Sequence, residues 1–450
     1  MKTNTSKNSA FDKIAEGVIY GNLGLFVGAG LSMAIMNKDE EPIALSWHSL
    51  LEKCADYFEI NFSQIMKEGK SYPQISTDLC RIIAKSKNIS QQAASEELKQ
   101  VISDLTSLYP DSSSRTKFSA YFNVLNPKWI ITTNYDTVIE SVLTGVGHSL
   151  APEDQLLAPA GRIPVYHLHG IRTNPSSIVI TQEDYVSLFR PNQYRQQKLP
   201  LTIKESVTLL VGYGLGDFNV LTAFDWSRNV FENNSSSYPN GMIQLIHTAD
   251  PNPVPYSKDG ILVIEFKDLA KCFEEMCEYV TVRKTKARSE YNKLKKLETK
   301  YANPTEKLIE GFLENKDVRS RVLQDLKASN HYYINGFLEL LSRALDQVWM
   351  EARKSGNFYQ YDNYLCILLD IIENIEFASS PPALVQTISY GLDKVGYYVG
   401  PGYGEAHGAF RTWSMRGKKL PLPVIKELRN ISKLNPSYHN IALLLKMIDK

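Results

Sequence analysis

Short apolar runs alternate with longer stretches of helical periodicity through the first two-thirds of the chain. Each run is long enough for a buried strand, and most are followed by glycine or small polar residues. The runs lie at residues 25–27, 129–131, 165–166, 178–180, 207–211, 242–247 and 261–266. Strands separated by helices predict an α/β fold with a mostly parallel sheet and right-handed crossovers.

Helical periodicity fills the intervals between these strands. Residues 11–19 predict an opening helix that Gly21 ends, and residues 47–57 place apolar side chains on one side of a second helix. Residues 63–125 are mainly helical in pattern, and residues 137–143 predict a short helix after the second strand.

The pattern changes near Thr281. Beyond residue 283 nearly every segment is helical in pattern, and we find no convincing fixed-period repeat. We therefore predict a polar, disordered lead over residues 1–10, an α/β domain over residues 11–282 and an all-helical domain over residues 283–450.

Two stretches of the helical region leave alternatives open. Basic side chains dominate residues 283–300, which indicates either a linker helix with a solvated face or a contact surface for an acidic partner. Residues 397–404 crowd tyrosines around glycine and proline. This pattern indicates a turn between helices, or a loop at a subunit or partner interface.

Composition narrows the class of protein. The 450 residues are 43% hydrophobic and 22% charged, as in an ordinary globular protein. A formal net charge of +1 gives no general attraction for nucleic acid, so we expect no direct sequence-specific nucleic-acid binding. No apolar run is long enough to span a membrane and the first residues lack the apolar core of a signal peptide, so we expect a cytoplasmic protein.

The five cysteines are scattered and suit a reducing compartment better than a disulfide framework. Only Cys272 and Cys277 lie close together in the sequence, five residues apart within a helical pattern. That spacing does not match a zinc knuckle, so we expect these two side chains to pack in the core.

Candidate chemistry lies in four loops that follow predicted strands. The loops cover residues 28–32, 132–136, 167–170 and 212–217. Because the carboxyl ends of parallel strands meet at one edge of a sheet, these loops predict a nucleotide cleft in a Rossmann-like fold.

The first loop reads Gly28-Ala29-Gly30 and stands between a strand and a predicted helix. Small residues let the backbone approach a pyrophosphate, and the amides at a helix N-terminus donate hydrogen bonds to it. Met33 stands where the common dinucleotide fingerprint has its third glycine, so this loop alone is equally consistent with a tight structural turn.

Polar residues in the second and third loops are candidates for acid–base work and for ligand binding. On a continued strand, Asn134 and Asp136 would point the same way and contact a ribose or a water, although Asp136 is also placed to cap the next helix. His167 and His169 share the same parity, so the residues alone offer two candidates for a general base. Asp217 either binds a ribose hydroxyl or caps a helix.

The order and spacing of these four loops resemble prokaryotic sirtuin-like proteins that hydrolyse NAD in anti-phage defence. The family's Gly-Ala-Gly-x-Ser segment, its Thr-x-Asn-x-Asp segment, its His-Gly pair and its later glycine loop all have counterparts here, over roughly residues 10–280. The resemblance implies that the nucleotide contacts Gly28, Ala29, Gly30, Ser32, Thr132, Gly212 and Gly214, with Asp217 as a further candidate.

The resemblance also implies catalytic roles. Asn134 would orient water or ribose, His169 would act as the base, and Asp136 would support the site. Protein deacetylases of the family carry two Cys-x-x-Cys pairs that hold zinc, but residues 170–212 contain no cysteine, so no zinc is expected. Their Gly-Ile-Pro-Asp-Phe-Arg continuation of the first loop is missing as well, which weakens processing of acyl-lysine peptides.

NAD is therefore the expected substrate, and the expected products are nicotinamide and ADP-ribose. An enzyme that depletes NAD needs restraint, so we expect the helical domain to control it through homo-oligomerisation or a partner such as a helicase-like ATPase, in abortive infection. The alternatives are a sensor that binds NAD or ADP-ribose without turnover, and a zinc-independent deacylase or ADP-ribosyltransferase.

Overall fold

The computed structural model describes residues 7–37, 42–67, 69–188, 194–213, 241–331, 333–399 and 407–448. The chain divides into two compact units, Met1–Ala287 and Arg288–Lys450, and each is described by itself. The long helix α12 (Leu269–Ala302) runs through this boundary, which lies close to the change in pattern near residue 283.

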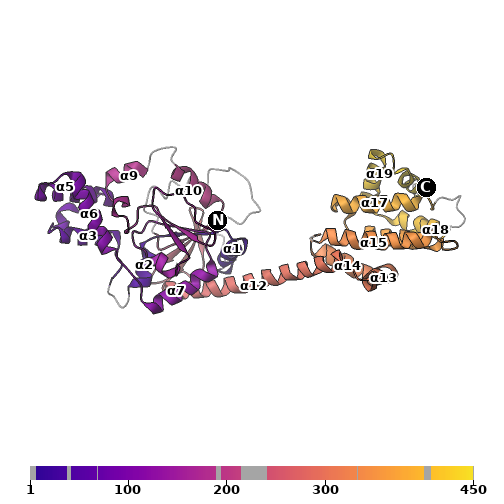
Figure 1. Cartoon of the computed structure of the whole chain (residues 1–450), viewed down its shortest axis with the longest axis horizontal. Coiled ribbons are helices and arrows are strands. Elements are labelled where there is room, and N and C mark those ends of the chain that lie inside the picture. The colour runs from indigo at the N-terminus through magenta and orange to yellow at the C-terminus, as the bar shows by residue number, and fades with distance from the viewer. Residues whose placement is uncertain are drawn as a thin grey trace. The chain divides into compact units, whose positions relative to one another are not determined.

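The first unit is built on an eight-stranded sheet with the order β3-β4-β2-β1-β5-β6-β8-β7. Figure 1 shows helices packed around this sheet. Neighbouring strands are parallel throughout, except that β7 runs antiparallel to β8. In this order the strands are β3 (Gly147–Leu150), β4 (Ile163–His167), β2 (Trp129–Thr132), β1 (Leu23–Val27), β5 (Val207–Val211), β6 (Gly241–His247), β8 (Ile261–Phe266) and β7 (Tyr256–Lys258). The predicted α/β class with a parallel sheet is confirmed.

The central strands are apolar along their whole length because both faces of the sheet are covered. Every residue of β1, β2 and β5 is buried. Alternate residues of β1 enter different cores: Leu25 and Val27 pack with α1, α7 and α12, and Phe26 packs with side chains of α10. The helices on the two faces are α1 (Lys7–Tyr20), α2 (Ala29–Met36), α7 (Ser112–Leu125), α8 (Val138–Val142), α10 (Tyr194–Lys204) and the first part of α12.

The strand order reverses at β1, and this reversal marks where a ligand site is expected along the edge of the sheet. From β1 the chain continues to β2 and the strands beyond it on one side, and later returns to β5 on the other side of β1. In open parallel sheets, ligands bind outside the carboxyl ends of the strands at such a reversal. The loops after β1 and β5 meet at this point.

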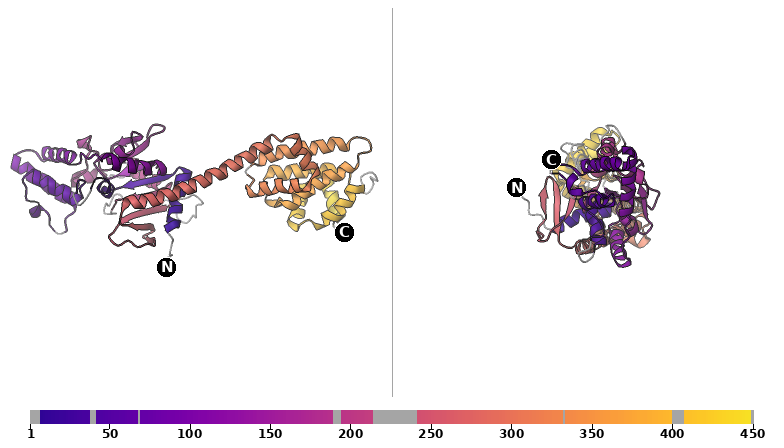
Figure 2. Two further views of the ribbon diagram at one scale, coloured as in Figure 1. Left: turned by 90° about the horizontal axis from the view of Figure 1, so that it is seen from below. Right: turned by 90° about the vertical axis from the view of Figure 1, so that its left-hand side faces the viewer.

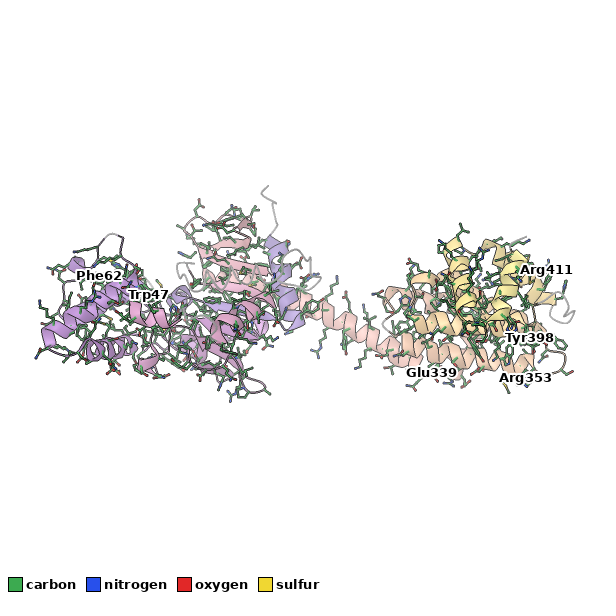
Figure 3. All side chains as sticks on the ribbon, turned by 90° about the horizontal axis from the view of Figure 1, so that it is seen from above. Trp47, Phe62, Glu339, Arg353, Tyr398 and Arg411 are labelled. Atoms are coloured by element: carbon green, nitrogen blue, oxygen red, sulfur yellow. The ribbon has the colours of Figure 1, made fainter. Side chains whose placement is uncertain are left out.

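A helical module lies beside this edge and has a core of its own. It consists of α3 (Trp47–Tyr57), α4 (Phe62–Ile65), α5 (Tyr72–Lys87) and α6 (Gln91–Leu105). Trp47 and Phe62 mark it in Figure 3. Serine side chains accept amide hydrogen bonds at the starts of α3 and α6, which ends the preceding loops sharply. The predicted helical character of residues 63–125 is therefore correct.

Two expectations about the first unit are wrong. The opening helix begins at Lys7, so residues 7–10 do not belong to a disordered lead: Ala10 is buried against the core and Lys7 pairs with Glu275. Residues 178–180 form no strand, although Ile178 and Ile180 are buried. Their side chains belong to the core of the helical module, and their apolar character reflects that packing instead of a place in the sheet.

The second unit is wholly helical over its described residues, and its helices pack side by side around one core (Figure 2). They are the end of α12, then α13 (Glu306–Glu314), α14 (Lys316–Ala328), α15 (Ile334–Ala352), α16 (Tyr359–Asn374), α17 (Pro382–Gly396), α18 (His407–Arg416), α19 (Leu422–Leu434) and α20 (His439–Ile448), with short 3-10 turns η2 (Phe377–Ser379) and η4 (Gly417–Lys419). Buried Asp370 pairs with both Arg319 and Arg416 inside this unit.

The structure answers part of the question for the two stretches, residues 283–300 and 397–404, whose alternatives the sequence leaves open. The basic residues 283–300 lie on α12, and none of their side chains is buried. The tyrosine-rich stretch begins where α17 ends, and Tyr398 stacks on Tyr361 with ring centroids 4.0 Å apart. Residues 400–404 lie outside the described residues. Among the described helices, none is both long and apolar enough to cross a membrane.

Candidate active site

A cavity of about 750 Å³ opens at the carboxyl ends of the central strands. The volume is in the range of small-molecule and cofactor sites. One side of the cavity is formed by the loops after β1, β2, β4 and β5: Gly28, Ala29, Ser32, Thr133, Asn134, Tyr135, Asp136, His169, Gly212 and Tyr213. The other side includes the helical module, with Trp47, Leu50, Met66, Lys70, Ser71, Tyr72, Pro73 and Leu105.

The glycines of the first loop are required by the loop after β5. The Gly30 amide donates to the Gly212 carbonyl at 3.0 Å, so the two loops touch through their backbones. A Cβ on Gly28 would lie 2.4 Å from the same carbonyl oxygen, and one on Gly212 would lie 2.2 Å from the Leu31 nitrogen. Gly212 also has φ +62°, where side chains are disfavoured. Because these glycines have no side chains, the loops after β1 and β5 can pack against each other and form the floor of the cavity.

A directed chain of hydrogen bonds joins the first loop to the second. The Asn134 side-chain amide donates to the Ser32 hydroxyl at 3.0 Å, and that hydroxyl donates to Asp136 Oδ1 at 3.1 Å. The Val138 amide donates to the same Oδ1 at 3.0 Å. Asp136 thus both caps α8 and anchors Ser32, and Ser32 holds the Asn134 carboxamide at the cavity wall.

Asn134 and Asp136 converge for a different reason than strand parity. β2 ends at Thr132, so both residues lie in the loop beyond it. Thr132 fastens that loop: its hydroxyl donates to the Val27 carbonyl at 3.1 Å and accepts from the Asn134 amide at 3.0 Å. Neither Thr132 nor Gly30 is among the described residues that line the cavity.

Asp136 is only 6% exposed. Burial raises its pKa above the ordinary value, while the hydrogen bonds from Val138 and Ser32 act in the opposite direction. Both donors favour an unprotonated Oδ1, so the carboxyl is held as an acceptor at the floor of the site.

His169 reaches the cavity from the turn after β4. It is 1% exposed, lies edge-on to Tyr185 with ring centroids 5.3 Å apart, and its carbonyl accepts from the Val179 amide at 2.8 Å. Gly170 follows with φ +93°, and a Cβ there would lie 2.3 Å from the Ser177 carbonyl oxygen. The glycine of the His-Gly pair therefore allows the turn that holds His169 at the cavity.

His167 does not share that orientation because β4 ends at this residue. Its ring is fully buried: Nδ1 lies 2.9 Å from the Asn134 carbonyl oxygen and Nε2 lies 2.8 Å from Glu140 Oε1. It is not among the described residues that line the cavity. The structure therefore distinguishes the two histidines: His169 faces the cavity and His167 lies behind Asn134.

Glu140 and His167 form a buried ion pair. Burial alone would lower the pKa of His167, but the hydrogen bond and charge of Glu140 raise it above the ordinary value. Burial alone would raise the pKa of Glu140, but the hydrogen bond and charge of His167, together with the Ser149 hydroxyl, lower it. Each partner thus favours the charged form of the other.

Sequence reasoning missed several residues of the site. Glu140 stands in the predicted helix over residues 137–143, but no pattern shows which strand residue it meets. Trp47 and Tyr72, whose rings stack 5.7 Å apart, and Lys70 lie on the module's side of the cavity. Helical periodicity predicts the apolar face of such a module but not which of its ends borders a cleft.

The remaining candidates have mixed outcomes. Gly214 and Asp217 lie outside the described residues. Cys272 and Cys277 are buried in the core that covers one face of the sheet, as expected. Over the described part of the chain, no group of three or more His, Cys, Asp or Glu side chains is placed to hold a metal ion.

Comparison with known proteins adds a family. Residues 128–254 match the family model of the SIR2-like domain, and this stretch contains Asn134, Asp136, His169 and Gly212. The predicted resemblance to sirtuin-like proteins is confirmed for this part of the chain.

Two curated relatives extend the similarity. The chain is 27% identical over 218 residues to NAD(+) hydrolase ThsA of Cytobacillus dafuensis, a match that covers 47% of this chain and 39% of that protein. It is 24% identical over 270 residues to Defense-associated sirtuin 2 of Bacillus subtilis, covering 57% of this chain and 24% of that protein. The chain thus spans well under half the length of these relatives.

Proposed function

We propose that this chain, which carries a SIR2-like domain, is an NAD hydrolase that cleaves the bond between nicotinamide and ribose. One observation carries the proposal: Asn134, Asp136 and His169 meet the glycine loops at one cavity, at the point where the strand order reverses. The name of the relative NAD(+) hydrolase ThsA supports the same substrate. The site residues are therefore proposed in the roles that the motif resemblance implies.

The reaction replaces a carbon–nitrogen bond by a carbon–oxygen bond. The bonding pair leaves with the pyridinium nitrogen, so nicotinamide departs neutral and needs no proton from an acid. The site must therefore hold the dinucleotide, stabilise the ribosyl cation and position water. The water oxygen bonds to the ribose carbon, and its proton passes to a base.

The described side chains can supply these functions. Asn134 Oδ1 accepts from a ribose hydroxyl or from the attacking water, while the amide nitrogen donates to Ser32 and orients the carboxamide. His169 takes the proton as general base. Asp136 fixes Ser32 and adds negative charge near the developing cation. Gly28, Ala29 and Gly212 bring backbone close to the phosphates.

An NAD-depleting enzyme must be restrained in its own cell, and the helical unit is the proposed element of control. We place there the contacts for homo-oligomerisation or for a partner such as a helicase-like ATPase. The name of the relative Defense-associated sirtuin 2 supports a role in defence, and depletion of NAD on infection would make that role abortive.

The test is NAD consumption by the purified full chain, with products separated by chromatography. We expect nicotinamide and ADP-ribose from the wild type, and a loss of at least about 100-fold in His169→Ala and in Asn134→Ala. His148→Ala, a half-buried histidine on β3, is the matched control and should keep its activity. Full turnover in either site variant would contradict the assignment, and tight NAD binding without turnover would favour a sensor.

A further inference from the structure

Behind the proposed catalytic loop lies a charged pair that neither the motifs nor the family comparison assigns. Glu140 on α8 and His167 at the end of β4 are joined at 2.8 Å, and Ser149 on β3 donates to the same Glu140 oxygen at 2.7 Å. His167 is 0% exposed and the Glu140 side chain is 17% exposed. Removing two charged groups from water costs free energy, which only close contact and further hydrogen bonds can offset.

The ring nitrogens of His167 define its protonation state by geometry. Nδ1 faces the Asn134 carbonyl oxygen at 2.9 Å, and a carbonyl can only accept, so Nδ1 carries a proton. Nε2 faces a carboxylate that already accepts from Ser149, so Nε2 carries a proton too. The ionisable groups that act on His167 are Glu140 from α8 and Asp136 from the loop after β2. All of them are acidic, which favours the imidazolium.

This imidazolium fixes the backbone of the residue whose side chain faces the substrate. The Asn134 peptide is bound at both ends: its amide donates to Thr132 Oγ1 and its carbonyl accepts from His167. The Asn134 carboxamide is then oriented by Ser32. A rigid backbone is needed for this because a carboxamide displaced by about 1 Å can lose about 100-fold in rate.

We propose that His167 and Glu140 are positioning residues of the active site: their buried ion pair clamps the Asn134 carbonyl and so holds the Asn134 carboxamide in its reactive position. The proposal rests on the proposed NAD hydrolysis. His167 is not among the described residues that line the cavity, so in this proposal it acts through Asn134 and takes no proton from the reaction. Two histidines two residues apart therefore have separate tasks, one as base and one as clamp.

The test measures NAD turnover and NAD affinity in the full chain with His167→Gln, Glu140→Ala and Glu140→Gln. We expect kcat to fall between about 10- and 100-fold in His167→Gln and Glu140→Ala, while KM and the Kd for NAD change less than about threefold. Glu140→Gln keeps an acceptor for Nε2 and should recover part of the loss. The control His148→Gln should stay within about twofold of wild type.

Spectroscopy provides a readout that a merely structural role would not move. In nitrogen-resolved NMR of the imidazoles, His167 should be doubly protonated at pH 7 in the wild type. As the pH is raised, the ring should become neutral at a lower pH in Glu140→Gln than in the wild type. A neutral His167 ring in the wild type would overturn the ion pair even if a variant is too unstable to assay.

The outcomes separate the two proposals. Wild-type turnover with unchanged kcat in folded His167→Gln and Glu140→Ala refutes the clamp and leaves the hydrolase standing. A proportional rise in KM and Kd also refutes it, because the pair would then serve binding of the whole nucleotide. Absence of NAD turnover in the wild type itself counts against the hydrolase, and the clamp as a catalytic device falls with it.

Discussion

Asp136 combines two tasks that normally fall to separate residues. Its Oδ1 accepts from the backbone at the start of α8 and from Ser32, which in turn holds Asn134. The cap of α8 and the position of the Asn134 side chain therefore depend on the same carboxylate oxygen, and a shift of Asn134 would disturb the first turn of α8. The same two hydrogen bonds offset part of the cost of burying the Asp136 carboxylate.

Asp136→Asn should separate stability from activity. The folded-state pKa of Asp136 is raised above the ordinary value of 3.8, so the folded protein must ionise a buried carboxyl as the pH rises through that raised pKa. Stability from the protonated form is present below 3.8 and is lost above the folded pKa. Asparagine keeps the accepting Oδ1 without the charge.

We therefore expect Asp136→Asn to raise the free energy of unfolding at pH 7 by on the order of 1 kcal/mol, with a smaller gain at pH 4, close to the ordinary carboxyl pKa of 3.8. Denaturant unfolding at both values measures this. NAD turnover should fall, because the charge near the ribosyl cation is lost. Asp250→Asn, at an exposed position, is the control and should change neither quantity. A gain that is equal at both pH values would contradict the origin in Asp136 ionisation.

At the scale of elements, the loops after β1 and β5 act as one structure. They are joined by the hydrogen bond from Gly30 to Gly212 and by the absence of side chains on both glycines. The glycines of this Gly-x-Gly segment therefore serve loop-to-loop packing as well as the approach to a phosphate that the sequence alone indicates. Both uses require the same residue type, so sequence cannot distinguish them.

Gly212→Ala should destabilise the first unit much more than a glycine replacement with the same backbone angle elsewhere. Its Cβ would lie 2.2 Å from the Leu31 nitrogen, so the two loops must separate. We expect a loss of at least about 3 kcal/mol, with strain from positive φ and the backbone overlap both contributing. Gly161→Ala is the matched control: φ is +78° and nothing lies within 4 Å, so about 1 kcal/mol should be lost. Equal losses in thermal unfolding would refute the packing role.

Much of the fold follows from the sequence because its signals are local. Apolar runs between helical stretches were sufficient to predict the strands β1, β2, β4 and β5 and the loops at their ends. The same local rule fails at residues 178–180, which are apolar because they pack on the helical module. A continuous apolar run reports burial, and burial alone does not identify a strand.

The site was predictable as a set of residues but not as a geometry. Extending strand parity past Thr132 and His167 fails, since both strands end there and turns set the later side chains. Parity gave His167 and His169 equal standing, and they are separated by the end of β4, by the turn at Gly170 and by the tertiary position of Glu140 on α8. Such partners are distant in sequence and carry no periodic signal.

At the scale of the whole molecule, the chain joins an α/β unit, which holds the proposed active site, to a helical unit with a core of its own. The second unit exposes large apolar and aromatic side chains: Met350, Tyr359, Tyr390, Tyr397, Leu422, Leu434 and Leu443 are each at least half exposed. Tyrosine and methionine are enriched at protein interfaces. This composition gives the proposed control by assembly a physical basis.

Assembly can be assigned to one unit by truncation. We expect the full chain to be a homo-oligomer in size-exclusion chromatography with light scattering, residues 288–450 to remain oligomeric, and residues 1–287 to be monomeric. The reason is that burial of the exposed apolar surface of the second unit would offset the entropy lost on association. Tyr390→Glu should shift the full chain toward monomer, because a buried unpaired charge opposes association. Tyr20→Glu, at a similarly exposed tyrosine of the first unit, is the control. A monomeric full chain, or oligomers formed by residues 1–287 alone, would place the control of NAD turnover elsewhere.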